Sequence, residues 1–311
     1  MRGSDTSSPT STYSVGICAS DSSPELARLV RAVLSEEPRG SRLTKLILVA
    51  SGCPESTLAP VRQLAEADSR LTLIVEPSRT GKVSAVNRII SASQGDFLVL
   101  TNSDATPLRG SIPALIEAIE SDTRIGSISA LPVFKKESGL TGEILWLVWS
   151  SHNISSLKLN HARLSNHNSD ELMVVRRCLM SHLPADVVND GAYIGGLLHK
   201  KGYMVNISES ARVEIDVPED VRGLIRQRRR IIYGHVQVWK RLGSPPRTVE
   251  SLLLTRPGTA LDVLRSAMRL RPKSLLVLPV AAVIEMMAFL LSVVDRLTPG
   301  SKHVVWRRPG T

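Results

Sequence analysis

The sequence predicts an α/β fold with a doubly wound, mostly parallel sheet, and two patterns indicate it. From Tyr13 to Glu120, short apolar runs of strand length alternate with amphipathic helical stretches. One of these runs also ends at once in polar turn residues, as a strand buried on both faces does. This run is Phe97–Leu100, which lies between Gly95 and a polar sequence that starts at Asn102.

The elements of this first part follow in regular order. Apolar runs predict strands at residues 13–19, 46–50, 71–75 and 97–100. Apolar residues at helical spacing predict helices at 24–37, 58–67, 83–92 and 112–120. Pro24 suits the first turn of the first helix, because its ring fixes a helical φ and its missing N–H would have no partner there.

The order changes after residue 120. Strands are expected at 125–133 and 172–176, with a long helical stretch around 140–157 between them. A helix at 189–200 with Gly202 as its C-cap, strands at 203–207 and 212–215 and a basic helix at 218–242 follow. Helical pieces near 249–254 and 260–270 lead into an apolar run at 275–294. We therefore expect a disordered leader over 1–12, an α/β domain over 13–243 and C-terminal helices over 244–311.

Composition narrows the class of protein. The chain has 311 residues, of which 42% are apolar and 22% charged, so a folded body with a substantial core is expected. Three cysteines far apart in the sequence make neither a disulfide framework nor a metal-ligand spacing, which favours a reducing compartment. The net charge of +10 points towards polyanionic partners: phosphate groups, anionic lipid or nucleic acid. The polar leader shows no secretory signal pattern.

Two phosphate-binding motifs are excluded. The sequence around Lys82 has Glu76 where a Walker motif needs its first glycine, and no Ser or Thr follows the lysine directly. The turn after the first strand lacks the glycines of a dinucleotide fingerprint.

Polar residues after the strand at 97–100 suggest a cation site. In an open α/β sheet, ligands bind at the carboxyl ends of the strands. The amide of Asn102 and the carboxylate of Asp104 would be placed there, where they could hold a hard cation that in turn holds a diphosphate. The alternative is that both residues cap the helix that begins near Ser111.

Six motifs in a fixed order carry a resemblance to a known family. They are GICASDSS from Gly16, LVASGCPEST from Leu48, RTGKVSAVNRII from Arg79, GDFLVLTNSDATP from Gly95, VVNDGAYIGGLLHKKGYMV from Val187 and RQRRRI from Arg226. In this order they resemble a family-2 glycosyltransferase of the GT-A fold, over Ser14 to Leu242. Some positions depart from the family pattern: Asp21 replaces an asparagine, Ala50-Ser51 replace two aspartates, Asn102 replaces an aspartate and Ile231 replaces a tryptophan.

The resemblance implies an inverting sugar transfer with a metal and a base. Asp104 would be the main ligand of Mn²⁺ or Mg²⁺, and Asn102 a weaker or water-mediated one. Asp190 would be the general base that takes the proton of the acceptor hydroxyl, with Asn189 in a supporting role. The alternative for Asp190 is a purely structural N-cap of the helix that follows it.

The resemblance also implies residues that contact the two substrates. A nucleotide-diphosphate sugar would be bound by Ala19, Asp21, Ser51, Lys82, Asn87, Asn102, Ser103 and Asp104. The diphosphate or the acceptor would contact Asn189, Gln227, Arg229 and Arg230, since guanidinium groups fork onto phosphate oxygens. Alternatives remain open: a solvated Lys82, an Asn87 that braces the loop beneath the donor, and a basic run that is a solvated face or a lipid contact. The histidines at 152, 161 and 167 lack convincing ligand spacing and are read as structural or exposed.

The apolar run 275–294 is long enough to cross about 30 Å of hydrocarbon as a helix. Glu285 near its middle and Pro279 make insertion as a lone helix marginal. An interfacial or oligomerising helix on an anionic leaflet fits as well, and a buried packing helix is a third reading. We expect a membrane-associated protein with its catalytic domain in the cytoplasm.

Three functions are weighed. The first is a metal-dependent inverting glycosyltransferase that uses GDP-mannose or a UDP-sugar and a glycan or lipid-linked acceptor. The second is a catalytically impaired relative that binds sugar nucleotides or acts as a scaffold, suggested by Asn102 and Asn189. The third, a nucleic-acid binder, rests on charge alone, and with 4% aromatic residues it lacks a stacking platform. No nucleic-acid partner is therefore expected.

Overall fold

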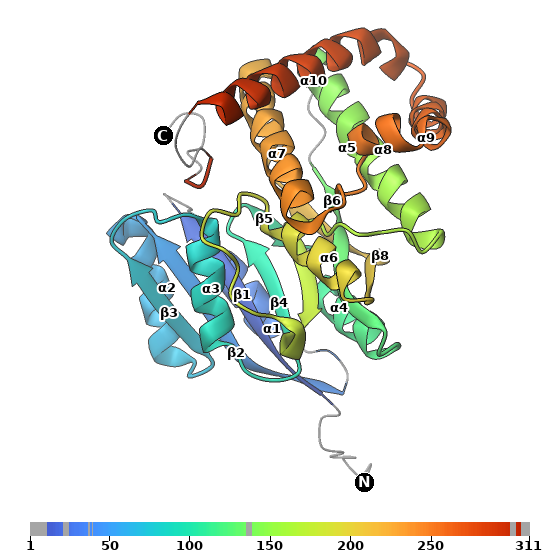
Figure 1. Cartoon of the computed structure of the whole chain (residues 1–311). Coiled ribbons are helices and arrows are strands. Elements are labelled where there is room, and N and C mark those ends of the chain that lie inside the picture. The colour runs from blue at the N-terminus through green and yellow to red at the C-terminus, as the bar shows by residue number, and fades with distance from the viewer. Residues whose placement is uncertain are drawn as a thin grey trace.

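The computed structural model has one eight-stranded sheet with helices on both faces and a helical layer at one edge (Figure 1). It describes residues 11–20, 25–36, 38, 40–134, 139–298 and 303–305. The strand order is β3-β2-β1-β4-β7-β6-β8-β5. The strands are β1 Ser11–Ser20, β2 Ser41–Ser51, β3 Leu71–Glu76, β4 Phe97–Asn102, β5 Ala105–Pro107, β6 Ile125–Val133, β7 Leu172–Arg176 and β8 Met204–Ile215.

The first half of the sheet is parallel, as the alternation of strands and helices predicts. β1 pairs with β2 and β4, and β2 pairs with β3, all in parallel. The connecting helices are α1 Leu26–Ser35, α2 Glu55–Ala67 and α3 Lys82–Ala92, followed by α4 Ser111–Glu120. Parallel strands need such crossovers, and their carboxyl ends therefore meet at one edge of the sheet.

The second half of the sheet is mixed. β7 is antiparallel to both of its neighbours, β4 and β6, whereas β8 is parallel to β6. β5 is a short strand that the sequence did not suggest. It pairs antiparallel with the end of β8, so β5 and β7 both run against the other strands of the sheet. The expectation of two strands at 203–207 and 212–215 is corrected: β8 is one continuous strand whose register shifts against β6. The mostly parallel sheet is confirmed.

Two apolar clusters cover the faces of the sheet. One lies under α1, α2 and α4 and includes Leu26, Val30 and Ile116. The other lies under α3 and α6, the helix Asp190–Lys200, and includes Ile89 and Leu198. Both faces are buried, which explains why the central strands read as continuous apolar runs. The predicted leader overlaps this core, since Ser11 and Thr12 belong to β1; residues 1–10 lie outside the described part.

A helical layer covers the edge at which β4 and β6 end (Figure 1). It consists of α5 Gly139–His161, α7 Val221–Leu242, α8 Val249–Thr255, α9 Pro257–Leu270 and α10 Ser274–Leu297. α10 packs on α7 and α5 through a stripe of buried residues that includes Val277, Ala281, Ile284 and Ala288. Within the described residues, α10 is the one helix whose length and mean hydropathy of 2.4 meet the requirements for crossing a bilayer.

Candidate functional site

The candidate site forms where the end of β4 meets the beginning of β7. Because these strands are antiparallel, Thr101 pairs with Leu172, and the residues before β7 lie at the carboxyl edge of the sheet. The side chain of Asn102 donates from Nδ2 to the carbonyl of Asp170 at 3.0 Å and to Oε2 of Glu171 at 3.5 Å. This reversal of β7 brings two acidic residues to the edge where ligands bind.

A lysine joins two carboxylates at the centre of this site. Lys82 is the first residue of α3, and Gly81 before it has a φ of 103°, a conformation that suits glycine. The Nζ of Lys82 lies 2.5 Å from Oδ2 of Asp170 and 3.0 Å from Oδ1 of Asp190. Asp190 begins α6, and its side chain is only 2% exposed. Three elements distant in sequence therefore converge on one ammonium group.

Asn189, not Asp190, caps α6. Oδ1 of Asn189 accepts a hydrogen bond from the backbone N–H of Ala192 at 3.0 Å, the usual N-cap arrangement. Gly234 of α7 lies against Asn189 so closely that a Cβ would approach its side chain to 2.8 Å. The Asp190 carboxylate faces Lys82 instead. Asp190 is therefore not the N-cap of α6, which was the structural alternative for this residue.

The charges of this cluster are strongly coupled. Burial alone would lower the pKa of Lys82, but the charges of Asp170 and Asp190 outweigh it and raise that pKa, so the ammonium group persists. Burial and the charge of Asp170 raise the pKa of Asp190, although Lys82 opposes the shift. Burial, together with the charges of Asp170 and Asp104, raises the pKa of Glu171 to about 8. Asp104, Asp170, Glu171 and Asp190 thus interact electrostatically within one cluster around Lys82.

The oxygen atoms at this edge are of the kind that binds a hard divalent cation. Asp104 follows β4 by two residues, and its backbone carbonyl accepts from the N–H of Asp216 at 3.2 Å. Among the described residues, no three His, Cys, Asp or Glu side chains are arranged to enclose a metal ion by themselves. Mg²⁺ is commonly bound by one or two carboxylates, with water and substrate phosphates as the other ligands. Asp104, with Asn102 and Glu171 beside it, fits that type of site.

The ends of β1, β2 and β3 form the other half of the edge. Ala19 and Ser51 lie there in adjacent strands, and Asp21 lies outside the described residues. The hydroxyl of Ser51 donates to Glu76 at 2.5 Å, and Glu76 also accepts from Thr80 and Arg88. Although burial acts in the opposite direction, these hydrogen bonds lower the pKa of Glu76. Glu76 thus supplies a buried charge beside the position where the family has aspartates.

Two other residues predicted to bind the nucleotide sugar make hydrogen bonds within the protein. Asn87 binds the backbone of Leu183 in both directions, donating at 2.9 Å and accepting at 2.7 Å. It thereby braces the loop that leads to Asp190, which is one of the two roles expected for it. Ser103 donates its backbone N–H to the carbonyl of Cys18 at 2.9 Å, so it joins the ends of β4 and β1.

The basic run on α7 divides between two directions. Arg230 donates to the carbonyl of Val188 at 3.1 Å, and its charge helps to lower the pKa of Asp170, after the larger effect of Lys82. Arg229 instead pairs with Asp295 of α10, which is 1% exposed. The structure therefore brings Arg230 to the site and places Arg229 between two helices. Gln227 is half-buried on the same helix.

The histidines form an unexpected row. His152 of α5, His167 and His235 of α7 contact edge to face, with ring centroids 6.0 and 5.3 Å apart. Burial lowers the pKa of His152 and of His235 to about 3, so both rings are neutral at neutral pH. His161 is exposed and pairs with Glu209.

Sequence reasoning did not single out Asp170, Glu171 or Glu76. Asp170 and Glu171 precede an apolar strand, and only the reversed direction of that strand brings them to the ligand edge. Glu76 ends an apolar strand, as Asn102 does, and that position is the signal by which it was detectable.

A mixed sheet of this strand order, with polar and charged groups gathered at its carboxyl edge, is the fold of a GT-A glycosyltransferase. The chain belongs to glycosyl transferase family 2, because the family model matches residues 14–180. The expected family, fold and enzyme class are therefore confirmed.

Two known proteins illustrate this relationship. The poly-β-1,6-N-acetyl-D-glucosamine synthase of Staphylococcus aureus is 21% identical over 199 residues, which cover 62% of this chain and 48% of that protein. The chain thus spans about half the length of the curated relatives it matches. A mannosyltransferase from Pyrobaculum calidifontis, solved with GDP-mannose and Mn²⁺, has a TM-score of 0.63 and 19% identity over 95% of this chain and 90% of that one. This likeness concerns the fold.

Proposed function

We propose that this glycosyltransferase moves a sugar from a nucleotide-diphosphate donor to a glycan or lipid-linked acceptor, with inversion at the anomeric carbon. GDP-mannose and UDP-sugars are the candidate donors. The observation that carries the proposal is the buried Asp190 carboxylate, 3.0 Å from Lys82, on a helix whose capping is done by Asn189.

Asp190 suits the role of general base. In a single displacement, the acceptor oxygen forms a bond to the anomeric carbon while the bond to the diphosphate breaks, and the hydroxyl proton passes to Asp190. A carboxylate with an ordinary pKa is a weak base, but burial and Asp170 raise the pKa of Asp190. Lys82 holds its carboxylate in place and opposes the rise of that pKa.

The donor's diphosphate would lie beside Asn102 and Asp104, the residues that would hold Mn²⁺ or Mg²⁺. Such an ion, when bound, stabilises the negative charge that develops on the leaving group. Arg230 adds a guanidinium charge on the same side as Asp170. The nucleoside would lie towards the ends of β1 to β3, where Ser51 and Glu76 present polar groups.

A thermal-shift screen of nucleotide sugars, each with and without Mn²⁺, tests the donor part of this proposal. A donor that binds should raise Tm only when the ion is present, since ion and diphosphate bind together. Asp190→Asn should keep that shift and lose turnover, whereas Asp104→Ala should lose both. Unchanged turnover in both variants would refute the proposed chemistry.

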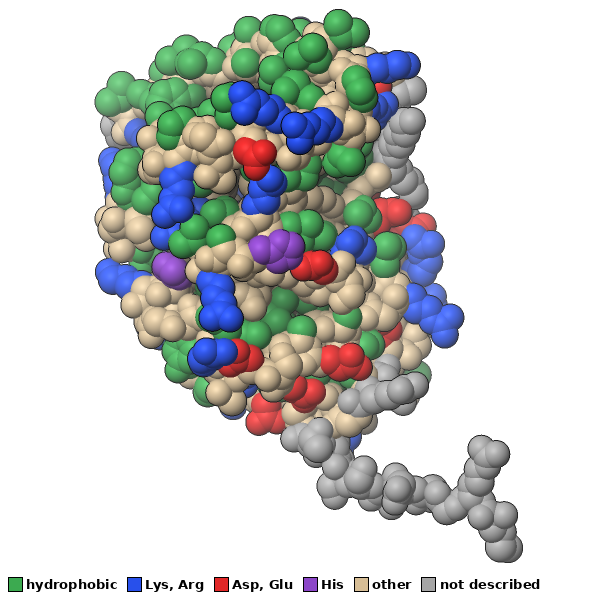
Figure 2. Space-filling model, turned by 90° about the vertical axis from the view of Figure 1, so that its right-hand side faces the viewer, with side chains coloured by type: hydrophobic (Ala, Val, Ile, Leu, Met, Phe, Trp, Pro, Cys, Tyr) green, Lys and Arg blue, Asp and Glu red, His purple; other side chains and the backbone are tan. Residues whose placement is uncertain are grey.

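We further propose that the protein lies on an anionic membrane surface through α10 rather than crossing it. Asp295 and Glu285 of α10 pair with Arg229 and Arg228 of α7, so the helix is held against the domain. Only 28% of its apolar window is buried, and its outer face exposes large side chains such as Leu276, which is 80% exposed. Figure 2 shows hydrophobic side chains gathered along the top of the molecule, with Lys and Arg side chains beside them.

An apolar face with basic neighbours is typical of an interfacial helix. Binding to vesicles that contain phosphatidylglycerol should fall when Leu276 is replaced by Glu and when salt is raised. If the chain without residues 272–311 is recovered in the soluble and membrane fractions in the same proportions as the full chain, membrane attachment through this segment is refuted. The catalytic domain is proposed to face the cytoplasm.

A further inference from the structure

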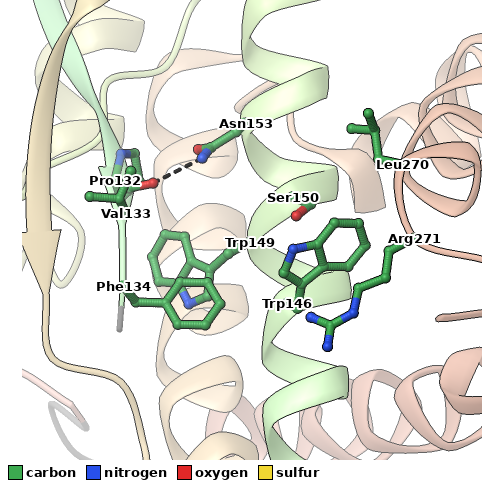
Figure 3. Close-up of a pocket in the computed structure, with 9 residues that line it drawn as sticks. All are labelled: Pro132, Val133, Phe134, Trp146, Trp149, Ser150, Asn153, Leu270 and Arg271. Atoms are coloured by element: carbon green, nitrogen blue, oxygen red, sulfur yellow. Dashed lines mark hydrogen bonds between the residues drawn. The ribbon is translucent and has the colours of Figure 1, made fainter. Parts of the chain in front are cut away.

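A cavity of about 470 Å³ opens where the end of β6 meets α5 and the end of α9 (Figure 3). This volume lies within the usual range of small-molecule sites. Phe134 lies at the end of β6, Trp146 and Trp149 project from α5, and Arg271 closes the far side. None of the residues expected from sequence to bind substrates lines this cavity.

Aromatic side chains are concentrated there. The whole chain has four Trp and three Phe, and the cavity takes two of the Trp and one of the Phe. Phe134, Trp146 and Trp149 are half-buried and pack against the core cluster beneath α10. Each therefore has part of its ring supported by the core and part left towards the cavity, around which Figure 3 draws the three side chains. Rings held in this way form rigid walls for a ligand.

Polar groups lie beside these rings. Asn153 of α5 donates from Nδ2 to the carbonyl of Pro132 at 2.9 Å, and within the described part of the chain its buried Oδ1 has no hydrogen-bond partner. Arg271 pairs with Glu143, and its guanidinium carbon lies 5.4 Å from the centroid of a Trp146 ring. The cavity thus offers an oriented group of N–H donors on Arg271 beside aromatic walls.

This combination matches a pyranose ring. A pyranose has faces of C–H groups that pack on aromatic rings, and a rim of hydroxyls that donate and accept hydrogen bonds. An acyl or prenyl chain would make no hydrogen bond to the guanidinium group of Arg271. A nucleotide base is expected at the other end of the edge, near Ser51.

The cavity opens at the same edge of the sheet as the candidate site. β6 is parallel to β4 with β7 between them, so both end at the same edge. The backbone N–H of Asp216 donates to the carbonyl of Asp104, and the next residue, Val217, packs into the same clusters as Phe134 and Trp149. Trp149 also contacts the row of neutral histidines through His152, with centroids 5.6 Å apart. A glycan bound in the cavity therefore lies at the same edge of the sheet as Asp190.

We propose that this cavity binds a pyranose unit of the acceptor glycan, a subsite away from the sugar that is transferred. This inference rests on the proposed function, because it gives the acceptor of that reaction a defined place. It predicts that longer acceptors bind more tightly than monosaccharides.

Calorimetric titration with mannotetraose and with the tetramer of N-acetylglucosamine tests the subsite. At least one tetramer should bind the wild-type protein, and Trp149→Leu and Asn153→Leu should each weaken that binding at least tenfold. Trp239→Phe is the matched control, because Trp239 is 47% exposed on α7 and does not line the cavity. Ser150→Trp, which fills the cavity from α5, is a second way to block it if Trp149→Leu or Asn153→Leu unfolds the protein.

Donor binding separates the two proposals. All four variants should keep the Mn²⁺-dependent Tm shift of the wild type with its nucleotide sugar, which also shows that they are folded. The subsite would be overturned if a tetramer binds the cavity variants as tightly as it binds the wild type. It would also be overturned if the wild type binds its nucleotide sugar but neither tetramer. A wild type that binds a tetramer in the cavity but no nucleotide sugar would refute the proposed function and leave the glycan site standing.

Discussion

Replacement of Asp190 by Asn is the most direct test of the chemistry. The change keeps the size of the side chain and an oxygen that accepts from Lys82, 3.0 Å away, but it removes the group that takes the proton. General-base catalysis contributes about 10²–10⁴-fold, which corresponds to about 3–5 kcal/mol of transition-state stabilisation. We therefore expect kcat to fall at least about 100-fold.

The same change should do little to folding. Lys82 keeps its 2.5 Å pair with Asp170, and loss of the Asp190 charge also removes its repulsion with Asp170. We expect the free energy of unfolding to change by less than about 2 kcal/mol, the scale of one hydrogen bond to a charged group. The Mn²⁺-dependent binding of the donor should be unchanged.

Initial rates of transfer at saturating donor, measured across pH, test whether Asp190 is the general base. Since burial raises the pKa of Asp190 above its ordinary value near 3.8, the wild-type rate should fall as pH drops through that raised pKa. The Asn variant should have a low rate without this acid limb. A folded variant that binds donor and keeps more than a tenth of the wild-type rate would show that Asp190 is not the base. Asp186→Asn, at an exposed carboxylate nearby in sequence, is the matched control.

Three further predictions follow from the same site. Lys82→Met should lower the free energy of unfolding in urea by about 3–5 kcal/mol, because it leaves the buried Asp190 and the half-buried Asp170 without their cation; a loss under 1 kcal/mol would contradict the pairing. Asp104→Ala should abolish the effect of Mn²⁺ on donor affinity in calorimetry, and an unchanged metal dependence would place the ion elsewhere. Burial lowers the pKa of His152 to about 3, below its unfolded value near 6.5, so the unfolded chain binds more protons between these values and stability rises with pH across them. His152→Gln should reduce that rise in urea midpoints measured from pH 4 to 7 but not remove it, because burial also lowers the pKa of His235 to about 3; exposed His161→Gln is the control.

Apolar periodicity by itself determined most of the architecture. Runs such as Phe97–Leu100 and Ile125–Val133 are buried on both faces and end in polar residues, so strands, helices and their order could be predicted locally. The same local signals located Lys82, Asp104 and Asp190 in motifs whose order indicates the family. These properties depend on residues close together in the chain.

Tertiary structure decided which of those residues meet. Strand direction is not encoded in local periodicity, so nothing in the sequence at Asp170 showed that β7 runs backwards and delivers this carboxylate to Lys82. The split of α7 is of the same kind: Arg230 faces the site while its neighbour Arg229 binds α10, since adjacent helical residues point about 100° apart. The cavity walled by Trp146 also needs three elements from distant parts of the chain, and only packing brings them together.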